Sequence, residues 1–329
     1  MNIDFHSHVI PTTFVAAIED DPAGLKARII GTGSDRKVVH DQGYVYPLFE
    51  EFTQPEAKLA AMDRKGIDIS VLSPAPPTFT YWADRDLAVQ VTSLVNDGVA
   101  DFVATRKDRF RGMGILPMQY PDDAIAELER IVEVHGFRSV EIGTGIEGVK
   151  HSDQRFRPVL KRASVLGIFI LAHPYYIGNK SGLEDYYLTN LIGNPLETTL
   201  MVADLMYSGT LDELPDLKIG LAHGGGFAPY QIGRLAHGHK VRSETRAKSQ
   251  TSPLDLLRRF YFDSVVFEPK ALTYLADLVG AEHVFLGTDA PFDMGDEDPM
   301  KTIADAPGLT DEQRAQIAGR TALSLLGEA

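Results

Sequence analysis

Residues 3–8 read IDFHSH, a short apolar run that ends in two histidines separated by one serine. Such a run predicts a β-strand, and side chains two residues apart on a strand project from the same face. His6 and His8 should therefore point toward one spot at the end of this first strand. A shared ligand is one explanation for that arrangement.

Seven more strand candidates follow, each separated from the next by a longer segment in which apolar residues recur at helical spacing. This alternation predicts βα units around a parallel sheet, and eight of them predict a (β/α)8 TIM barrel within one domain of residues 1–329. The predicted strands are residues 1–8, 67–74, 110–118, 137–144, 167–174, 217–226, 260–266 and 283–292.

Two segments interrupt the alternation, and both follow a strand. Residues of about 21–54 form an insertion in which RKVVHDQGYVYP (36–47) predicts a hairpin around Asp41-Gln42-Gly43. Residues 175–192 form a loop rich in glycine and tyrosine. NPLE (194–197) predicts the start of the next helix with Asn194 as its cap, and the segment from Thr310 predicts one or two closing helices.

The amino-acid composition restricts the kinds of binding partner that the protein can have. The net charge of −14 argues against nucleic acid, which binds basic surfaces, but it leaves room for a small anionic substrate. With no cysteine, any metal site must use nitrogen and oxygen ligands. No apolar run approaches the ~20 residues that span a bilayer, so we expect a cytoplasmic protein without membrane contact.

Four histidines and one aspartate lie at predicted strand ends, namely His6, His8, His173, His223 and Asp289. A single strand histidine is more often a hydrogen-bonded core residue. Together, however, these residues converge on the mouth of a barrel, and such a set suits Zn²⁺ with a position left open for water or substrate. The other histidines, which fall in loops and helices, are interpreted as surface residues: 40, 135, 151, 237, 239 and 283.

Several motifs spread along the chain carry a resemblance. The sequence resembles the metal-dependent amidohydrolase superfamily, and within it the 2-amino-3-carboxymuconate-6-semialdehyde decarboxylase group. The similar segments are DFHSHVIP (4–11), TYWA (80–83), GILPMQYPDDAIAELER (114–130), AHP (172–174), NPLETT (194–199), LAHGGGFAPYQIGRLAHG (221–238) and FLGTDAPF (285–292).

The resemblance implies that one metal ion is bound by His6, His8, His173 and Asp289 together with a water. Zinc is the expected ion, with Mn²⁺ or Co²⁺ as alternatives. His223 would be the catalytic base or hydrogen-bond donor beside that water. The fourth predicted strand lacks the lysine that holds a second metal in other amidohydrolases, so a single ion is expected.

The resemblance also implies a homodimer, in which Arg234 and Arg242 reach toward the substrate carboxylate of the neighbouring site. The hairpin of the first insertion departs from the group's pattern, because Tyr46 stands about where the group has a substrate-binding arginine. Arg36 or Lys37 on the other arm could compensate. Asn190 similarly replaces a tryptophan. Substrate contacts should therefore differ from those of the parent group.

Trp82 and Phe292 are interpreted as walls for a flat substrate, with core packing as the alternative for Trp82. The expected activity is non-oxidative decarboxylation of a carboxylated aromatic compound or ring-cleavage product. Asp289 or His223 would deliver a proton to the carboxylated carbon before CO₂ departs. Two alternatives are a metal-dependent hydrolase or hydratase at the same site, and a binding protein without activity.

Overall fold

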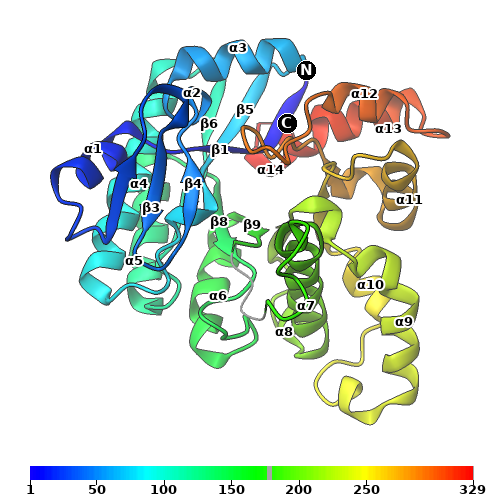
Figure 1. Cartoon of the computed structure of the whole chain (residues 1–329). Coiled ribbons are helices and arrows are strands. Elements are labelled where there is room, and N and C mark those ends of the chain that lie inside the picture. The colour runs from blue at the N-terminus through cyan, green and yellow to red at the C-terminus, as the bar shows by residue number, and fades with distance from the viewer. Residues whose placement is uncertain (176–179, 329) are drawn as a thin grey trace.

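The computed structural model describes residues 1–175 and 180–328, and its short parallel strands form the wall of a closed barrel, as predicted. Figure 1 shows the helices arranged around these strands. β1 pairs with β5 and β5 with β6, while β7 to β12 pair in chain order. Met113 separates β6 from β7, and these two strands occupy one barrel position. The strands are β1 (Ile3–Val9), β5 (Ile69–Pro74), β6 (Phe110–Gly112), β7 (Gly114–Ile115), β8 (Ser139–Gly143), β9 (Phe169–His173), β10 (Lys218–Leu221), β11 (Phe260–Asp263) and β12 (Val284–Phe285).

Hydrogen bonds between the first and last strand positions close the barrel. The Phe5 amide donates to the Leu286 carbonyl at 2.8 Å, and the His8 amide donates to the Ala290 carbonyl at 2.8 Å. The eight predicted strands are therefore confirmed, although each is shorter than its predicted range.

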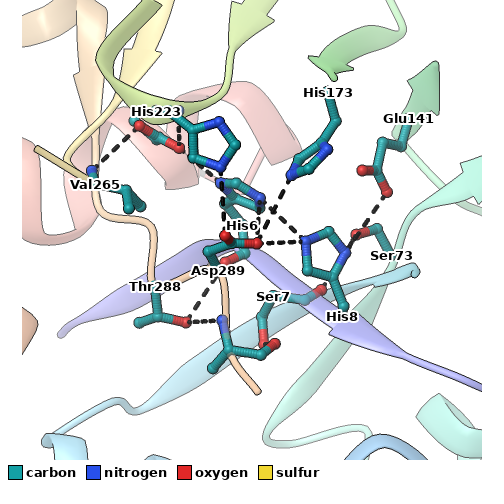
Figure 2. Close-up of polar contacts among 12 residues, drawn as sticks. His6, Ser7, His8, Ser73, Glu141, His173, His223, Val265, Thr288 and Asp289 are labelled. Atoms are coloured by element: carbon teal, nitrogen blue, oxygen red, sulfur yellow. Dashed lines mark hydrogen bonds and ion pairs between the residues drawn. The ribbon is translucent and has the colours of Figure 1, made fainter. Parts of the chain in front are cut away.

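An irregularity in β1 changes which side chains face the barrel interior. Asp4 pairs with Ser70 and Ser7 pairs with Leu72, so three steps on β1 lie opposite two steps on β5. An extra residue of this kind shifts the alternation of a strand. Ile3 and Phe5 consequently belong to the apolar barrel core, whereas His6 and His8 point inward beyond it (Figure 2).

The base of the barrel, at the end where β1 begins, is filled by apolar side chains and closed by the C-terminal helix. Ile3 and Phe5 pack with Phe169, Leu171 and Phe285, and α14 (Thr321–Leu326) adds its buried face to this cluster. A second, larger cluster fills the space between the barrel wall and the outer helices. The packed base leaves the opposite end of the barrel available for a site.

The outer helices begin and end at recognisable signals. Asp84 accepts a hydrogen bond from the Leu87 amide at the start of α4, and Thr310 forms a capping box with Gln313 before α13. Besides α14, the α-helices are α1 (Thr12–Asp20), α2 (Glu50–Thr53), α3 (Pro55–Lys65), α4 (Arg85–Thr105), α5 (Pro121–Arg130), α6 (Arg157–Leu166), α7 (Asn194–Tyr207), α8 (Thr210–Glu213), α9 (Ala228–Val241), α10 (Pro253–Leu257), α11 (Pro269–Val279), α12 (Pro299–Ala304) and α13 (Asp311–Ala315).

Short 3-10 and π turns complete the helical elements. They are η1 (Gly33–Asp35), η2 (Pro76–Thr78), η3 (Ile131–His135), η4 (Gln154–Phe156), η5 (Thr189–Gly193), η6 (His223–Gly225), η7 (Ser243–Arg246), η8 (Ala281–His283) and η9 (Gln316–Arg320). The closing helices predicted from Thr310 onward are confirmed as α13, η9 and α14.

The insertion after β1 forms the predicted hairpin and one strand more. β3 (Lys37–His40) and β4 (Val45–Pro47) are joined by a tight turn in which Gly43 has a φ of 89°. β2 (Ala27–Ile30), which the sequence did not predict, pairs antiparallel with β3. Figure 1 shows this small sheet at one side of the barrel, beside α1.

The predicted loop at 175–192 includes residues 176–179, which lie outside the described residues. Its last part is η5, which runs directly into α7. Asn194 has helical backbone angles and its side chain makes no capping bond, so its predicted role as a cap is wrong. Within the described chain, no helix is both long and apolar enough to cross a membrane.

Candidate metal centre

Four side chains meet where β1, β9 and the segment after β12 end (Figure 2). They are His6, His8, His173 and Asp289, all buried, and one ligand atom from each lies within 4.8 Å of the others. His8 Nε2 is 3.0 Å from Asp289 Oδ1 and 3.1 Å from His6 Nε2. His6 Nε2 and His173 Nε2 lie 3.4 and 3.7 Å from the same carboxylate oxygen.

These separations fit a divalent metal ion. Ligands bound tetrahedrally at the usual Zn–N and Zn–O distances stand roughly 3.4 Å apart, and the atom pairs above bracket that value. His173 Nε2 is buried and has no hydrogen-bond partner among the described residues. A buried polar atom of this kind needs a partner, and a cation among the four ligand atoms would provide one.

Asp263, at the end of β11, orients His6. Its Oδ2 lies 2.6 Å from His6 Nδ1, and its two oxygens also accept bonds from the amides of His223, Gly224 and Val265. Because this carboxylate accepts the Nδ1 proton, the Nε2 lone pair of His6 is left for a metal. Carboxylates behind histidine ligands raise the basicity of the ligand and fix its tautomer.

The other two imidazoles are oriented in the same way. His173 Nδ1 donates to the carbonyl of Pro174 at 2.7 Å. Ser73 Oγ donates to the Ser7 carbonyl, so it can accept from His8 Nδ1, which lies 3.0 Å away. All three histidines therefore present a bare Nε2 to one point.

Asp289 is the shared neighbour of four imidazoles. Burial would raise the pKa of its carboxyl, but its contacts with His173, His223, His6 and His8 outweigh burial and hold that pKa well below the usual value. A proton donor needs a raised pKa instead. An ionised Asp289 is suited to the role of a metal ligand, and its role as proton carrier stays a prediction.

His223 stands beside the ligand group rather than within it. Its Nε2 is 3.3 Å from Asp289 Oδ2, whereas the other carboxylate oxygen faces the three ligand imidazoles. His223 Nδ1 is buried without a hydrogen-bond partner in the described structure. His223 and Asp289 both have a positive φ, of 56° and 57°, a strained conformation that is common at functional sites.

The glycine run after His223 makes a tight turn and a close approach to the backbone of α7. Gly224 has a φ of 59°, and a side chain on Gly226 would place its Cβ only 2.2 Å from the Pro195 carbonyl oxygen. Only glycine tolerates both restrictions. The run therefore allows η6 to turn tightly beside α7.

Lys58, on α3, lies at the barrel seam, where β1 pairs with the segment that follows β12. Its buried ammonium donates to the carbonyls of His8 and Ala290, at 3.0 and 3.2 Å. These two residues lie on β1 and directly after Asp289. Lys58 therefore holds together the two segments that carry three of the four ligands.

A cavity of 330 Å³ opens onto the metal ligands. Tyrosine, phenylalanine and proline side chains form most of its wall, and no lysine or arginine is part of that wall among residues 1–175 and 180–328. His223, Tyr46, Asn190 and Phe292, which the sequence singled out as catalytic or substrate-binding residues, all line this cavity. The ring of Phe292 lies 5.2 Å from that of His8.

Three other predicted substrate contacts lie elsewhere in this chain. Trp82 borders a different cavity and packs under Lys26, with Nζ 5.6 Å from the ring centroid. Arg234 is exposed on α9, and the exposed Arg242 binds Glu244 at 2.6 Å. None of the three contributes to the wall of the 330 Å³ cavity.

The suggested compensating cations of the hairpin are also outside this wall. Arg36 binds Glu19 at 2.6 Å and borders a separate groove, and Lys37 is exposed. Neither side chain therefore supplies a positive charge to the cavity at the metal ligands.

Two histidines interpreted as surface residues are buried. His40 is 2% exposed and bonds to Tyr46, and His151 is 1% exposed and donates from Nε2 to the Gly143 carbonyl. His151 borders a cavity of 610 Å³ that contains none of the metal ligands. The prediction that His40 and His151 are surface residues is therefore wrong, because a position in a hairpin or loop does not show whether a side chain is buried.

The amidohydrolase family model matches residues 3–327. The chain is 31% identical to 2-amino-3-carboxymuconate-6-semialdehyde decarboxylase of Dictyostelium discoideum, over 99% of this chain and 92% of that protein. It is 28% identical to the gamma-resorcylate decarboxylase of Rhodococcus jostii, over 81% of this chain and 85% of that protein. The 5-carboxyvanillate decarboxylase of Sphingomonas paucimobilis has the same fold, with a TM-score of 0.84 and 23% identity over 99% of this chain and 98% of that one.

Proposed function

Because the chain belongs to the amidohydrolase family, we propose that it is a metal-dependent non-oxidative decarboxylase of a carboxylated aromatic compound or ring-cleavage product. The observation that carries this proposal is the convergence of three bare imidazole nitrogens and one carboxylate beside a fourth histidine. The names of the relatives support the reaction, since both similar sequences are decarboxylases.

Zinc is the metal that we propose for the site. His6, His8, His173 and Asp289 would hold it, and three nitrogens with one oxygen are a donor set that Zn²⁺ favours. Mn²⁺ and Co²⁺ accept the same donors, so metal content must be measured rather than deduced from affinity order. When bound, the ion supplies a Lewis acid beside the substrate oxygens.

The chain's own residues supply the proton. His223 lines the cavity and is the imidazole outside the ligand group, so we assign to it the delivery of a proton to the ring carbon that bears the carboxylate. The new C–H bond uses an electron pair of the ring. The C–C bond to the carboxylate then breaks, its electrons return to the ring, and CO₂ leaves.

The cavity wall would hold the substrate in position for this step. Phe292 and the tyrosines offer flat apolar surfaces to a ring, and their packing excludes water from the reacting carbon. Asp289 stays ionised and holds His223 through Oδ2. This contact keeps the proton-bearing ring beside the cavity.

We also propose that the enzyme is a homodimer in which Arg234 and Arg242 approach the site of the second copy. Both arginines are exposed in this chain and lie outside its own cavity. An apolar surface next to the cavity supports an interface, because Leu191, Ile192 and Leu200 on η5 and α7 are between 41% and 56% exposed. Light scattering in solution tests the dimer, and Arg234→Ala tests its contribution to substrate affinity.

The central experiment is a panel of aromatic and muconate-type carboxylic acids, assayed for CO₂ release by the chelator-treated protein with and without added Zn²⁺, Mn²⁺ or Co²⁺. We expect release with at least one acid, only in the presence of metal. Formation of a hydrated or hydrolysed product without CO₂ would instead identify a hydrolase or hydratase. A protein that holds no metal, is unaffected by chelator and turns over none of the acids would instead be a binding protein without activity.

A further inference from the structure

The hairpin wall of the catalytic cavity contains a tyrosine and histidine pair that the metal chemistry does not use. Tyr46 on β4 lines the cavity together with the metal ligands His173 and Asp289. His40, at the end of β3, lies outside the wall, and its ring stacks on Tyr46 with centroids 5.6 Å apart. His40 Nε2 is 3.1 Å from the Tyr46 hydroxyl.

Both members of this pair are uncharged near neutral pH. Burial lowers the pKa of His40 to about 4 and raises the pKa of the Tyr46 phenol above its usual value. The two side chains are 2% and 4% exposed. The hairpin wall therefore offers hydrogen bonds without offering a charge.

The pair can adapt to a hydroxyl group. If His40 donates from Nε2, the Tyr46 hydroxyl is left to donate to a ligand, and if His40 accepts, the Tyr46 oxygen can accept from a ligand. No second bond selects between these tautomers, because His40 Nδ1 is buried without a partner in the described structure. A hydroxyl, which is both donor and acceptor, can be bound in either state.

The rest of the wall is unfavourable for a second carboxylate. Its ionisable acidic residues are Asp289 and Asp293, and no arginine or lysine lines it among the described residues. The residues at 176–179, which the structure does not describe, read Tyr-Ile-Gly-Asn and carry no charge. A carboxylate buried beside this wall would lose its hydrating water and gain no cation as a partner, so its binding there would be unfavourable.

We propose that Tyr46, positioned by His40, determines the specificity of the cavity by binding an uncharged hydroxyl on the substrate ring, so that the substrate is a phenolic acid with a single carboxylate. This inference rests on the proposed function and narrows its substrate class. Arg234 of a second copy is not part of the hairpin wall and would act on a carboxylate whichever group Tyr46 holds. The two contributions are therefore separable.

The test measures binding by calorimetry to the full-length, zinc-loaded protein. The probes are benzoate, the three monohydroxybenzoates, 2,6-dihydroxybenzoate, isophthalate and terephthalate. We expect at least one hydroxybenzoate to bind about tenfold more tightly than benzoate, as one hydrogen bond allows, and both dicarboxylates to bind more weakly than that hydroxybenzoate. A dicarboxylate that binds most tightly, also in the Arg234→Ala variant, would overturn the proposal.

Three variants locate the preference. Tyr46→Phe keeps the ring and should abolish the advantage of the hydroxybenzoate over benzoate. His40→Leu should reduce that advantage, and His40→Gln, whose amide can still bond to Tyr46, should restore it. Tyr120→Phe removes a hydroxyl that bonds to the Ala83 carbonyl away from the cavity and should retain the full preference.

The outcomes separate this inference from the proposed function. A hydroxyl preference that persists in Tyr46→Phe would refute the role of Tyr46 even if CO₂ release is found. If no acid releases CO₂ with any metal, the decarboxylase proposal fails, while the binding preference and its loss in Tyr46→Phe would still stand on their own measurement.

Discussion

The carboxylate of Asp263 lies 2.6 Å from Nδ1 of His6, although 257 residues separate them in the chain. This bond fixes the ring of a metal ligand from behind, and the same carboxylate holds the backbone of the turn at His223. Asp263 thus connects the proposed metal ligands with His223, to which we assign the proton transfer. The sequence did not single out Asp263.

We expect Asp263→Asn to weaken metal binding by about 10- to 100-fold, as loss of the partner behind a histidine ligand does elsewhere. The amide can present the wrong group to His6 Nδ1, so the imidazole loses its fixed tautomer. Competition with a metal-binding dye measures the affinity. Asp204→Asn is a suitable control, because Asp204 bonds to Ser152 away from the ligand group. Equal affinity in wild type and Asp263→Asn would show that this bond does not tune the metal.

His223→Asn should leave the metal content near that of the wild type and lower kcat by ~10² or more. The reason is geometric: the three ligand imidazoles surround one oxygen of Asp289, and His223 contacts the other. Metal analysis and CO₂ release are measured on the same preparation. Unchanged turnover would remove His223 from the mechanism, and loss of metal would make it a ligand.

Much of the fold was predictable because each barrel strand is a short apolar run followed by a longer segment with helical spacing. The first strand shows the limit of this approach. The spacing of His6 and His8 predicts a shared face, but the irregularity between Asp4 and Ser7 decides that this face is the interior. β2 was missed because its sequence ARII is short and does not alternate between apolar and polar residues, and its pairing with β3 depends on the fold.

The metal ligands were predictable from residue type and position together, whereas their supporting residues were not. Asp263 is a single acidic residue at the end of a strand, a pattern that has no distinctive spacing. An acidic residue at the end of the seventh strand was nevertheless a usable signal, since all such ends meet at one mouth. His40 and His151 were misjudged because burial of a hairpin or loop residue depends on distant packing.

Removal of the metal should destabilise the protein as well as inactivate it. Binding to the folded state alone adds about 2.7 kcal/mol to the free energy of unfolding at a metal concentration 100 times Kd. We expect chelator treatment to lower the Tm and abolish CO₂ release, and added Zn²⁺ to restore both. A Tm that is independent of added metal would contradict a metal site built from the folded barrel.

Lys58→Met should reduce both stability and metal affinity. The change removes the ammonium's bonds to the carbonyls of His8 and Ala290, although the Ala290 carbonyl keeps its bond from the His8 amide, and it leaves Asp4 without a nearby cation. Removing such a buried charged group costs roughly 3 kcal/mol. Chemical denaturation measures stability in the presence of chelator, and dye competition measures metal affinity.

Lys65→Met is the matched control for Lys58→Met. Lys65 is also buried on α3, but it bonds to Asp296 and Glu297 rather than to the barrel seam. We expect this variant to lose stability without losing metal affinity. If the two variants affect metal binding equally, the seam contact of Lys58 has no special role.

Acid should destabilise the hairpin through His40. Its pKa falls from an ordinary value near 6.5 when unfolded to about 4 when folded, because burial disfavours the imidazolium. As the pH decreases from 6.5 to 4, the unfolded chain takes up a proton at this residue and the folded chain does not. The contribution of His40 is therefore fully present above pH 6.5 and declines by about 1.4 kcal/mol per pH unit across that window.

The measurement compares the free energy of unfolding of wild type and His40→Gln between pH 4 and pH 8, in chelator so that metal release does not contribute. Glutamine does not titrate, so the difference in stability between the two proteins should shift in favour of His40→Gln as the pH falls below 6.5, and should be constant above it. His135→Gln serves as a comparison, because His135 lies near the surface beside Asp97. A difference between wild type and His40→Gln that is independent of pH would mean that His40 has the same pKa in the folded and unfolded chains, and that burial does not keep its imidazole neutral in acid.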